Sequence, residues 1–467
     1  MEKQKKRLPR CARNDMVSRR EVLRDTAGAV AAFTIVPGHM LAGAAGQRPS
    51  DKLNLAAIGV GGMGDYNIKQ CSTENFVALC DVDDAYAAKV FDRFPNAKKY
   101  KDFRVMLDKE DKNIDGVVIA TPDHTHSVIT MACLKHGKHI YLQKPLAHSI
   151  SEVRKLTEAA REAKVQTQMG NQGHSSDEIR MLYEWIADGA IGPVREVYAW
   201  SDRPVGGDPW SDFPIMARPK ETPPVPVTLD WDLWLGPAQY RPYHPVYCPM
   251  NWRGWWDFGT GALGDMGCHI LDPVFWVLKL GHPTRVEATT THYQPEVASE
   301  TYPRAAVIRY EFPARGDMPP VKLTWFDGRL LPPRPKDLEP GRRLEGNGAL
   351  LIGDKGTIMH GSHGAGGVRI IPEVKMKAYK RPEKTIPRVK GGQSGHEQDW
   401  IRACKDGKPA NSTFEYGGPL TEIVLLGVLA MRLKDTPLEW DPVNLKVTNN
   451  SEANKYINPV FREGWVL

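Results

Sequence analysis

Residues 55–64 read Leu-Ala-Ala-Ile-Gly-Val-Gly-Gly-Met-Gly, an apolar run that leads directly into Gly59-x-Gly61-x-x-Gly64. The next apolar run, residues 76–80, ends on Asp81. This spacing is typical of a strand, a glycine turn, a helix and a second strand. The glycines allow a tight turn, a close backbone approach to a pyrophosphate, and close packing of helix on strand. The helix N-terminus attracts phosphate, so the stretch predicts a dinucleotide site.

Asp81 bears on which dinucleotide would bind. A carboxylate here accepts hydrogen bonds from a ribose diol and repels a 2′-phosphate, so the sequence favours NAD over NADP. The alternative is a glycine turn that binds no ligand, and the acid at the end of the next strand argues against it. The cofactor-binding candidates in this stretch are Gly59, Gly61, Gly62, Met63, Gly64 and Asp81.

Residues 51–170 continue the alternation of strands and helices, which predicts an α/β fold with an N-terminal Rossmann doubly wound parallel sheet. We expect further strands at 114–120, 139–142 and 165–169, and helices at 84–94, 103–107, 126–136 and 151–163. Ligands of such sheets lie beyond the carboxyl ends of the strands. The polar residues expected there are Thr121, Asp123, His126 and Gln143 for the cofactor, and Asn171 for a substrate.

Residues 171–440 predict a second domain, followed by a tail at 441–467. Seven of the thirteen tryptophans lie between Trp200 and Trp256. Period-two patterns then predict an open, mostly antiparallel sheet. Its expected strands are 284–293, 305–312, 321–326 and 349–359, and two amphipathic helices are expected at 396–405 and 419–433. The seven cysteines show no zinc-like spacing, so no metal site is predicted.

The charge of the chain is concentrated at its N-terminus. Residues 1–44 hold nine basic and four acidic residues, which leaves 53 basic against 52 acidic in the rest. A nearly neutral body does not indicate binding to nucleic acid or to a membrane surface. Ser18-Arg19-Arg20, the weakly apolar residues 27–41 and the small residues 42–44 predict a twin-arginine signal peptide without a membrane anchor. A disordered basic tail beside an apolar helix is the alternative.

Asp265 and His269 are the strongest catalytic candidates in the second half of the chain. Their i, i+4 spacing places both on one face of a helix, where the carboxylate could orient the imidazole as a base. Lys144 follows a buried strand and precedes Pro145, so it could polarise a substrate oxygen at the crevice. Structural roles are the alternative for each of these residues, and for Asp272 as well.

Tryptophans and tyrosines gather shortly before this helix. Flat rings with polar rims can stack on sugars, but most of these rings are expected to be core or interface packing. Trp252 and Arg253 are the exception that we expect to contact a substrate.

Together these motifs resemble the glucose–fructose oxidoreductase/inositol dehydrogenase (Gfo/Idh/MocA) family, from about residue 52 to 435. The resemblance is carried by the glycine turn, Asp81, residues 120–126, Lys144-Pro145, residues 234–237, Asp265…His269, residues 353–356 and the helix after His396. It implies hydride transfer on sugars or polyols, with roles for Lys144, Asp265 and His269. It also implies that residues 171–440 form an α/β domain for substrate binding and oligomerisation. Gln143 departs from the family's usual glutamate and removes a negative charge beside Lys144.

We therefore expect an exported oxidoreductase that acts on CH–OH groups of a carbohydrate, with tightly bound NAD and a homo-oligomeric assembly. The expected partners are the carbohydrate and the twin-arginine export machinery, and the expected location is the periplasm or beyond it. One alternative is a glycosidase or lyase that oxidises its substrate transiently, eliminates and returns the hydride. The other is a nucleotide- or sugar-binding protein without catalysis.

Overall fold

The computed structural model describes residues 51–291, 294–434 and 436–467. Residues 53–467 form one compact unit, separate from residues 1–52. The predicted signal peptide, residues 1–44, lies outside the described residues.

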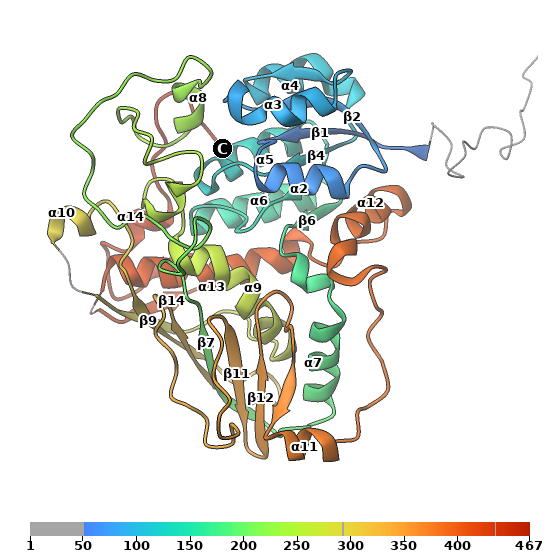
Figure 1. Ribbon diagram of the computed structural model, residues 1–467, viewed down its shortest axis with the longest axis vertical. Coiled ribbons are helices and arrows are strands. Elements are labelled where there is room, and N and C mark those ends of the chain that lie inside the picture. The colour runs from blue at the N-terminus through green and yellow to red at the C-terminus, as the bar shows by residue number, and fades with distance from the viewer. Residues whose placement is uncertain (1–50, 292–293, 435) are drawn as a thin grey trace, which may run out of the picture. The chain divides into compact units, whose positions relative to one another are not determined.

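The N-terminal part contains the predicted Rossmann sheet, in which all paired strands are parallel (Figure 1). The strand order is β3-β2-β1-β4-β5-β6. The strands are β1 (Asn54–Ile58), β2 (Asn75–Cys80), β3 (Lys98–Tyr100), β4 (Gly116–Ile119), β5 (His139–Leu142) and β6 (Thr167–Met169). The helices are α2 (Met63–Gln70), α3 (Asp84–Arg93), α4 (Phe103–Glu110), α5 (His126–Lys135) and α6 (Ile150–Ala163). The sequence did not predict β3, an edge strand of three residues without alternation.

The second sheet has nine strands in the order β13-β12-β11-β7-β10-β9-β8-β14-β15. Only β7 and β10 pair in parallel among its described strands, so the sheet is mostly antiparallel as predicted. Its strands are β7 (Val194–Trp200), β8 (Arg285–Thr290), β9 (Ala306–Phe312), β10 (Val321–Phe326), β11 (Gly348–Gly353), β12 (Gly356–His360), β13 (Arg369–Ile371), β14 (Leu438–Asp441) and β15 (Lys446–Val447).

Two expectations for this part were wrong. The single strand expected at 349–359 is a hairpin, because Gly353-Asp-Lys-Gly356 turns the chain back on itself. The central strand β7 and the helix α7 (Asp177–Ala187) were missed, since the tryptophan and proline content nearby suggested only short loops.

The remaining helices of this part are α8 (Trp231–Leu235), α9 (Gly261–Val277), α10 (Pro295–Ala298), α11 (Glu373–Ala378), α12 (His396–Asp406), α13 (Phe414–Arg432) and α14 (Asn454–Ile457).

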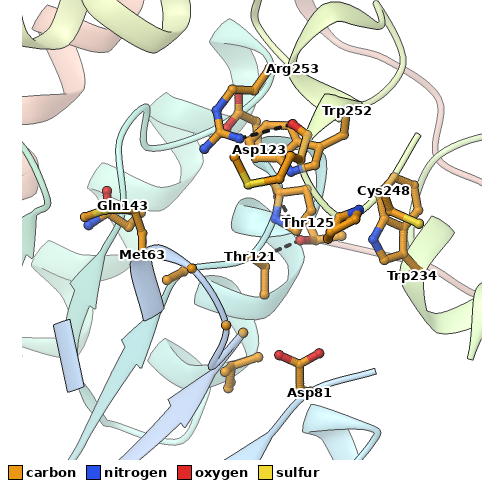
Figure 2. Close-up of a pocket in the computed structure, with 18 of the residues that line it drawn as sticks. Met63, Asp81, Thr121, Asp123, Thr125, Gln143, Trp234, Cys248, Trp252 and Arg253 are labelled. Atoms are coloured by element: carbon orange, nitrogen blue, oxygen red, sulfur yellow. Dashed lines mark hydrogen bonds between the residues drawn. The ribbon is translucent and has the colours of Figure 1, made fainter. Parts of the chain in front are cut away.

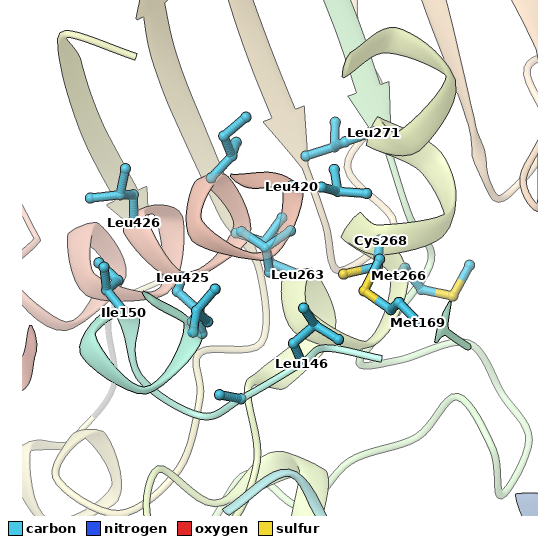
Figure 3. Packing of buried hydrophobic residues seen from close by; sticks show 14 of the residues in the cluster. Leu146, Ile150, Met169, Leu263, Met266, Cys268, Leu271, Leu420, Leu425 and Leu426 are labelled. Carbon is cyan, nitrogen blue, oxygen red and sulfur yellow. The ribbon is translucent and has the colours of Figure 1, made fainter. Parts of the chain in front are cut away.

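The helices α9 and α13 form the layer between the two sheets (Figures 1 and 3). Their apolar residues point in several directions, which is typical of helices buried on all sides. Helix α13 packs against α6, α9 and β8. It is long and apolar enough to cross a membrane, but 78% of that segment is buried in the protein, as in a core helix. Side chains that meet in this layer include Leu146, Ile150, Leu263, Leu271, Leu420 and Leu425, all almost fully buried.

Helix α12 joins the N-terminal domain although it lies more than two hundred residues beyond it in the sequence. Trp400 is fully buried, and its ring meets that of Tyr141 on β5 edge-on, with centroids 5.8 Å apart. Glu397, on the same helix, accepts hydrogen bonds from Asn67 Nδ2 at 2.8 Å and from the Tyr141 hydroxyl at 3.0 Å. The hydrophobic core of the Rossmann domain is therefore completed by a helix from the C-terminal half of the chain.

Candidate active site

The glycine turn has the geometry that its sequence predicts. Gly59 has a φ of 76°, which is unfavourable for a residue with a side chain. A Cβ on Gly64 would lie 1.9 Å from the carbonyl oxygen of Gly59, so only glycine lets α2 pack this close to β1. The ring of Tyr86 lies against Gly61 and leaves no room there for a side chain.

Asp81 lies at the carboxyl end of β2 and faces the same turn. Its carboxylate accepts the backbone N–H of Val60 at 2.9 Å and that of Asp83 at 3.1 Å. A carboxylate has about four lone-pair sites, so acceptor capacity remains for a ribose diol. Burial raises the pKa of Asp81 to about 6. The turn and this acceptor fit the nucleotide half of NAD.

One cavity is lined by residues from the glycine turn to α9. Figure 2 shows part of its lining, from Met63 and Asp81 to Trp252 and Arg253. The volume of the cavity is about 290 Å³. The cavity brings together most of the predicted site residues: Gly59, Gly61, Gly62, Met63, Asp81, Thr121, Asp123, Gln143, Lys144, Trp252, Arg253, Asp265 and His269.

Gly64, His126 and Asn171 do not line this cavity. His126 is buried, and its two ring nitrogens contact the carbonyl oxygens of Pro145 at 2.7 Å and Thr121 at 2.8 Å. Through these two contacts, His126 fixes the backbone beside the cavity. Asn171 is fully buried and accepts the Ser412 hydroxyl at 2.6 Å.

The segment after β4 alternates between the cavity and the protein interior. Thr121, Asp123 and Thr125 line the cavity. The Thr125 hydroxyl donates to the Thr121 hydroxyl at 2.8 Å, and Asp123 accepts the Thr260 hydroxyl at 2.6 Å. His124, like His126, is bonded only to backbone carbonyls.

Lys144 and Asp265 form an ion pair at the α9 end of the cavity. Lys144 Nζ donates to Asp265 Oδ1 at 2.8 Å and to the Asp265 carbonyl at 2.7 Å. Arg203 Nε lies 3.0 Å from Oδ2, and Arg253 Nε lies 3.4 Å from Oδ1. Burial alone would raise the pKa of Asp265, but the three cations outweigh it and hold the pKa far below its usual range.

The structure does not show the predicted hydrogen bond between Asp265 and His269. The i, i+4 spacing does place both residues in the cavity, but the three cations occupy the carboxylate. His269 Nδ1 has no hydrogen-bond partner among the described residues. Burial, and next the proximity of His363 and Lys144, lower the pKa of His269 well below 6.5. The imidazole is therefore neutral near pH 7 and able to accept a proton.

Gln143 donates from Nε2 to Asn67 Oδ1 at 2.9 Å, and Asn67 donates in turn to Glu397. Glu397 is fully buried, and burial raises its pKa. The carboxyl group of Glu397 is thus connected to Gln143 by two hydrogen bonds, through Asn67.

Four of the aromatic residues that precede α9 belong to a packed cluster, in line with the core packing expected for most of these rings. Trp231 and Trp234 stack with ring centroids 4.8 Å apart, and Tyr247 and Trp255 pack with them. Trp252 is buried too but reaches the cavity, where the Arg253 guanidinium lies over its ring at 4.2 Å. Asp272 is buried between His174 and Tyr416, at 2.9 Å and 2.5 Å, which is a structural position.

The sequence did not indicate Arg203 or His363 as cavity residues. His363 lies between β12 and β13, and its ring stacks on that of His269 with centroids 4.1 Å apart. Burial lowers the pKa of His363 to about 4. Both residues are in irregular segments remote from α9 in the chain, where no periodic pattern indicates the direction of a side chain.

The fold and the cavity define an oxidoreductase-type architecture: a dinucleotide-binding Rossmann domain joined to an α/β domain. Two family models match in this order. The first, "Oxidoreductase family, NAD-binding Rossmann fold", covers residues 53–171. The second, "Oxidoreductase family, C-terminal alpha/beta domain", covers residues 205–313. Both are models of the Gfo/Idh/MocA oxidoreductases, and they cover 119 and 109 residues of this chain.

Curated relatives match over part of their length. The myo-inositol 2-dehydrogenase of Thermotoga maritima is 27% identical over 30% of this chain and 42% of its own. The inositol 2-dehydrogenase of Rubrobacter xylanophilus is 30% identical over 32% and 44%. The levoglucosan dehydrogenase of Pseudarthrobacter phenanthrenivorans is 25% identical over 47% and 46%. The matches thus span less than half of each relative.

Solved structures match over nearly their whole length. A levoglucosan dehydrogenase in complex with NADH has a TM-score of 0.55 at 17% identity, over 83% of this chain and 98% of its own. The WlbA dehydrogenase from Bordetella pertussis, in complex with NADH and UDP-GlcNAcA, has a TM-score of 0.56 at 16% identity, over 84% and 99%. At these identities the likeness is one of fold.

Proposed function

We propose that the protein is an NAD-dependent dehydrogenase that transfers hydride between its cofactor and an alcohol carbon of a carbohydrate or cyclitol. The observation that carries the proposal is the cavity itself. It holds the glycine turn and Asp81 at one end, and Lys144 and a neutral His269 at the other. The similarity to inositol and levoglucosan dehydrogenases supports it.

Bound NAD would supply the hydride acceptor. Lys144 has three N–H donors and gives two to Asp265, so one remains for the substrate oxygen. Its positive charge stabilises the negative charge that develops on that oxygen. The neutral imidazole of His269 accepts the hydroxyl proton. Asp265 acts as a positioning residue for Lys144.

The test is a screen of sugars and polyols against the purified protein, read from the near-ultraviolet absorbance of reduced nicotinamide. We expect at least one substrate to reduce bound or added NAD. A protein that binds no pyridine nucleotide would overturn the proposal. Release of an aglycone without net reduction would instead identify the oxidation–elimination route, and no response to any sugar would favour a binding protein.

We also propose that the protein is exported by the twin-arginine route and assembles as a homo-oligomer. The proposal of export rests on the sequence around Arg19 and Arg20. This route exports folded proteins, and free nicotinamide nucleotide is scarce outside the cytoplasm, so we expect the cofactor to be held tightly. Replacing both arginines with lysine should retain the protein in the cytoplasm. An exported protein that releases no nucleotide on denaturation, yet turns over with dilute NAD, would contradict tight retention.

A further inference from the structure

The α9 end of the cavity carries more positive than negative charge. Lys144, Arg203 and Arg253 all converge on Asp265. Asp123 is the other carboxylate that lines this end, and it accepts a hydrogen bond from the neutral hydroxyl of Thr260. Asp208 also acts on Arg203, but it is exposed to solvent, which screens its charge, and it does not line the cavity. The two histidines, His269 and His363, have lowered pKa values and add no charge near pH 7. Three cations thus face two carboxylates, and one positive charge is left uncompensated.

The two arginines also have unused donors. Arg253 gives Nη1 to the carbonyl of Met250 at 3.3 Å, and Arg203 directs Nη1 to the sulfur of Met266. Within the described part of the chain, neither Nη2 has a hydrogen-bond partner. Both side chains are only about a fifth exposed, at 18% for Arg253 and 19% for Arg203. A partly desolvated guanidinium with free N–H groups favours an acceptor that carries charge.

Arg253 is the better placed of the two to meet a ligand. Its Nε is 3.4 Å from Asp265, against 3.0 Å for Arg203, so it is less committed to the ion pair. The central carbon of its guanidinium lies 4.2 Å from the centroid of the Trp252 ring, and this cation–π contact restrains the group that carries the donors. A planar fork held in this way matches a planar carboxylate, since two parallel N–H···O bonds can form.

We propose that the substrate is an acidic carbohydrate, whose carboxylate binds Arg253 with support from Arg203. The inference rests on the proposed dehydrogenase function and specifies its substrate class. A carboxylate carries one negative charge, which equals the uncompensated charge of this end of the cavity. A phosphate dianion would leave the balance negative.

The test compares matched pairs of sugars on the full-length protein: methyl glucuronoside with methyl glucoside, and methyl galacturonoside with methyl galactoside. Reduction of NAD gives kcat/KM, and calorimetry gives the affinity of each sugar whether or not it turns over. We expect the acid of at least one pair to be preferred about 10- to 100-fold, the range of a charge-assisted hydrogen bond.

The Arg253→Gln variant should bring the ratio between acid and neutral sugar close to one, mainly through a higher KM for the acid. Arg195→Gln is the matched control, because Arg195 is 58% exposed and pairs with Asp354 away from the cavity. It should keep the wild-type ratio. A variant that fails to fold would show in its melting curve, and Arg253→Lys would then replace it; lysine keeps the charge but lacks the fork, so the ratio should fall only in part.

Turnover of neutral sugars with no preference for either acid would overturn this inference and leave the dehydrogenase proposal standing. Binding of acids and neutral sugars with equal affinity would overturn it as well. Binding of an acid without reduction of NAD would support the inference and contradict the dehydrogenase proposal. Equal preference in wild type and Arg253→Gln would also refute the role of Arg253.

Discussion

The two ends of the cavity differ in charge and in how the chain builds them. The end near β2 presents Asp81, held by backbone N–H groups of Val60 and Asp83. The end near α9 presents Lys144, Arg203 and Arg253 around Asp265. The first end is made by residues 59–83, whereas the second gathers residues that are spread from 144 to 265. The comparison teaches that the cofactor end depends on residues that are near one another in the sequence. The arrangement of charges at the α9 end depends on how the folded chain packs.

The largest effect is expected at the α9 end, from Lys144→Ala. Loss of the ammonium removes the group that stabilises charge on the reacting oxygen, so kcat should fall about 10³-fold or more. Cofactor content, measured after denaturation, should stay unchanged. Lys69→Ala is the control, since Lys69 is 51% exposed and pairs with Asp65. Near-normal turnover in Lys144→Ala would remove Lys144 from the mechanism.

His269→Ala should lower kcat by about 10²- to 10³-fold through loss of the base. The pH profile of the wild type is a second check. Since burial lowers the pKa of His269, the imidazole stays neutral well below its ordinary value of 6.5. Turnover that depends on the neutral ring should therefore persist on acidification past that value and decline only further down. A group that titrates between pH 6 and 8 in kcat, and is lost in His269→Ala, would contradict this.

Gly64→Ala tests the geometry of the β2 end rather than its charge. The added methyl would overlap the Gly59 carbonyl, so the helix must shift, and the free energy of unfolding should fall by about 1–3 kcal/mol. Chemical denaturation measures it. Gly356→Ala is the control, since the nearest atom to its Cβ would lie at 3.5 Å, an ordinary contact. Equal stability of the two variants would show that the close packing at Gly64 is relaxed in solution.

The smallest effect is expected from Asp81→Asn, which should weaken NAD binding about tenfold, as expected for one charge-assisted hydrogen bond. Burial raises the pKa of Asp81 to about 6, so the carboxylate is protonated as the pH falls through that value. The protonated group loses acceptor capacity, and the affinity of the cofactor-free protein for NAD should decrease below pH 6. Titration calorimetry at several pH values tests this. Asp81→Asn should flatten the profile, and an unchanged slope in the variant would assign the titration to another group.

The sequence predicted the Rossmann sheet well because its signals are local. Each strand carries its own apolar run, and the glycine turn reports a backbone geometry that neighbouring residues alone require. The same holds for β10, expected at 321–326 and found there. The hairpin of β11 and β12 was missed because the Gly353-Asp-Lys-Gly356 turn lies between two short apolar runs that together resemble one longer strand.

The orientation of Asp265 shows where local reasoning stops. Spacing along a helix places Asp265 and His269 on one face, but it does not say which partner a carboxylate takes. That choice follows from the electric field of Lys144, Arg203 and Arg253, which come from other segments. Coulomb attraction in a buried site is strong, so three nearby cations outcompete a neutral imidazole.

The sequence by itself thus determined the strand–turn–helix geometry at Gly59–Gly64, the acid at Asp81 and the resemblance to an oxidoreductase family. Backbone sterics and hydrogen bonds between near neighbours are sufficient for these. Only the tertiary structure decided that Trp400 completes the first domain and that Arg203 and His363 enter the cavity. It also decided that Asp265 forms its ion pair with Lys144 and makes no hydrogen bond with His269. Burial and the distances between charges set these properties, and both exist only once the chain is packed.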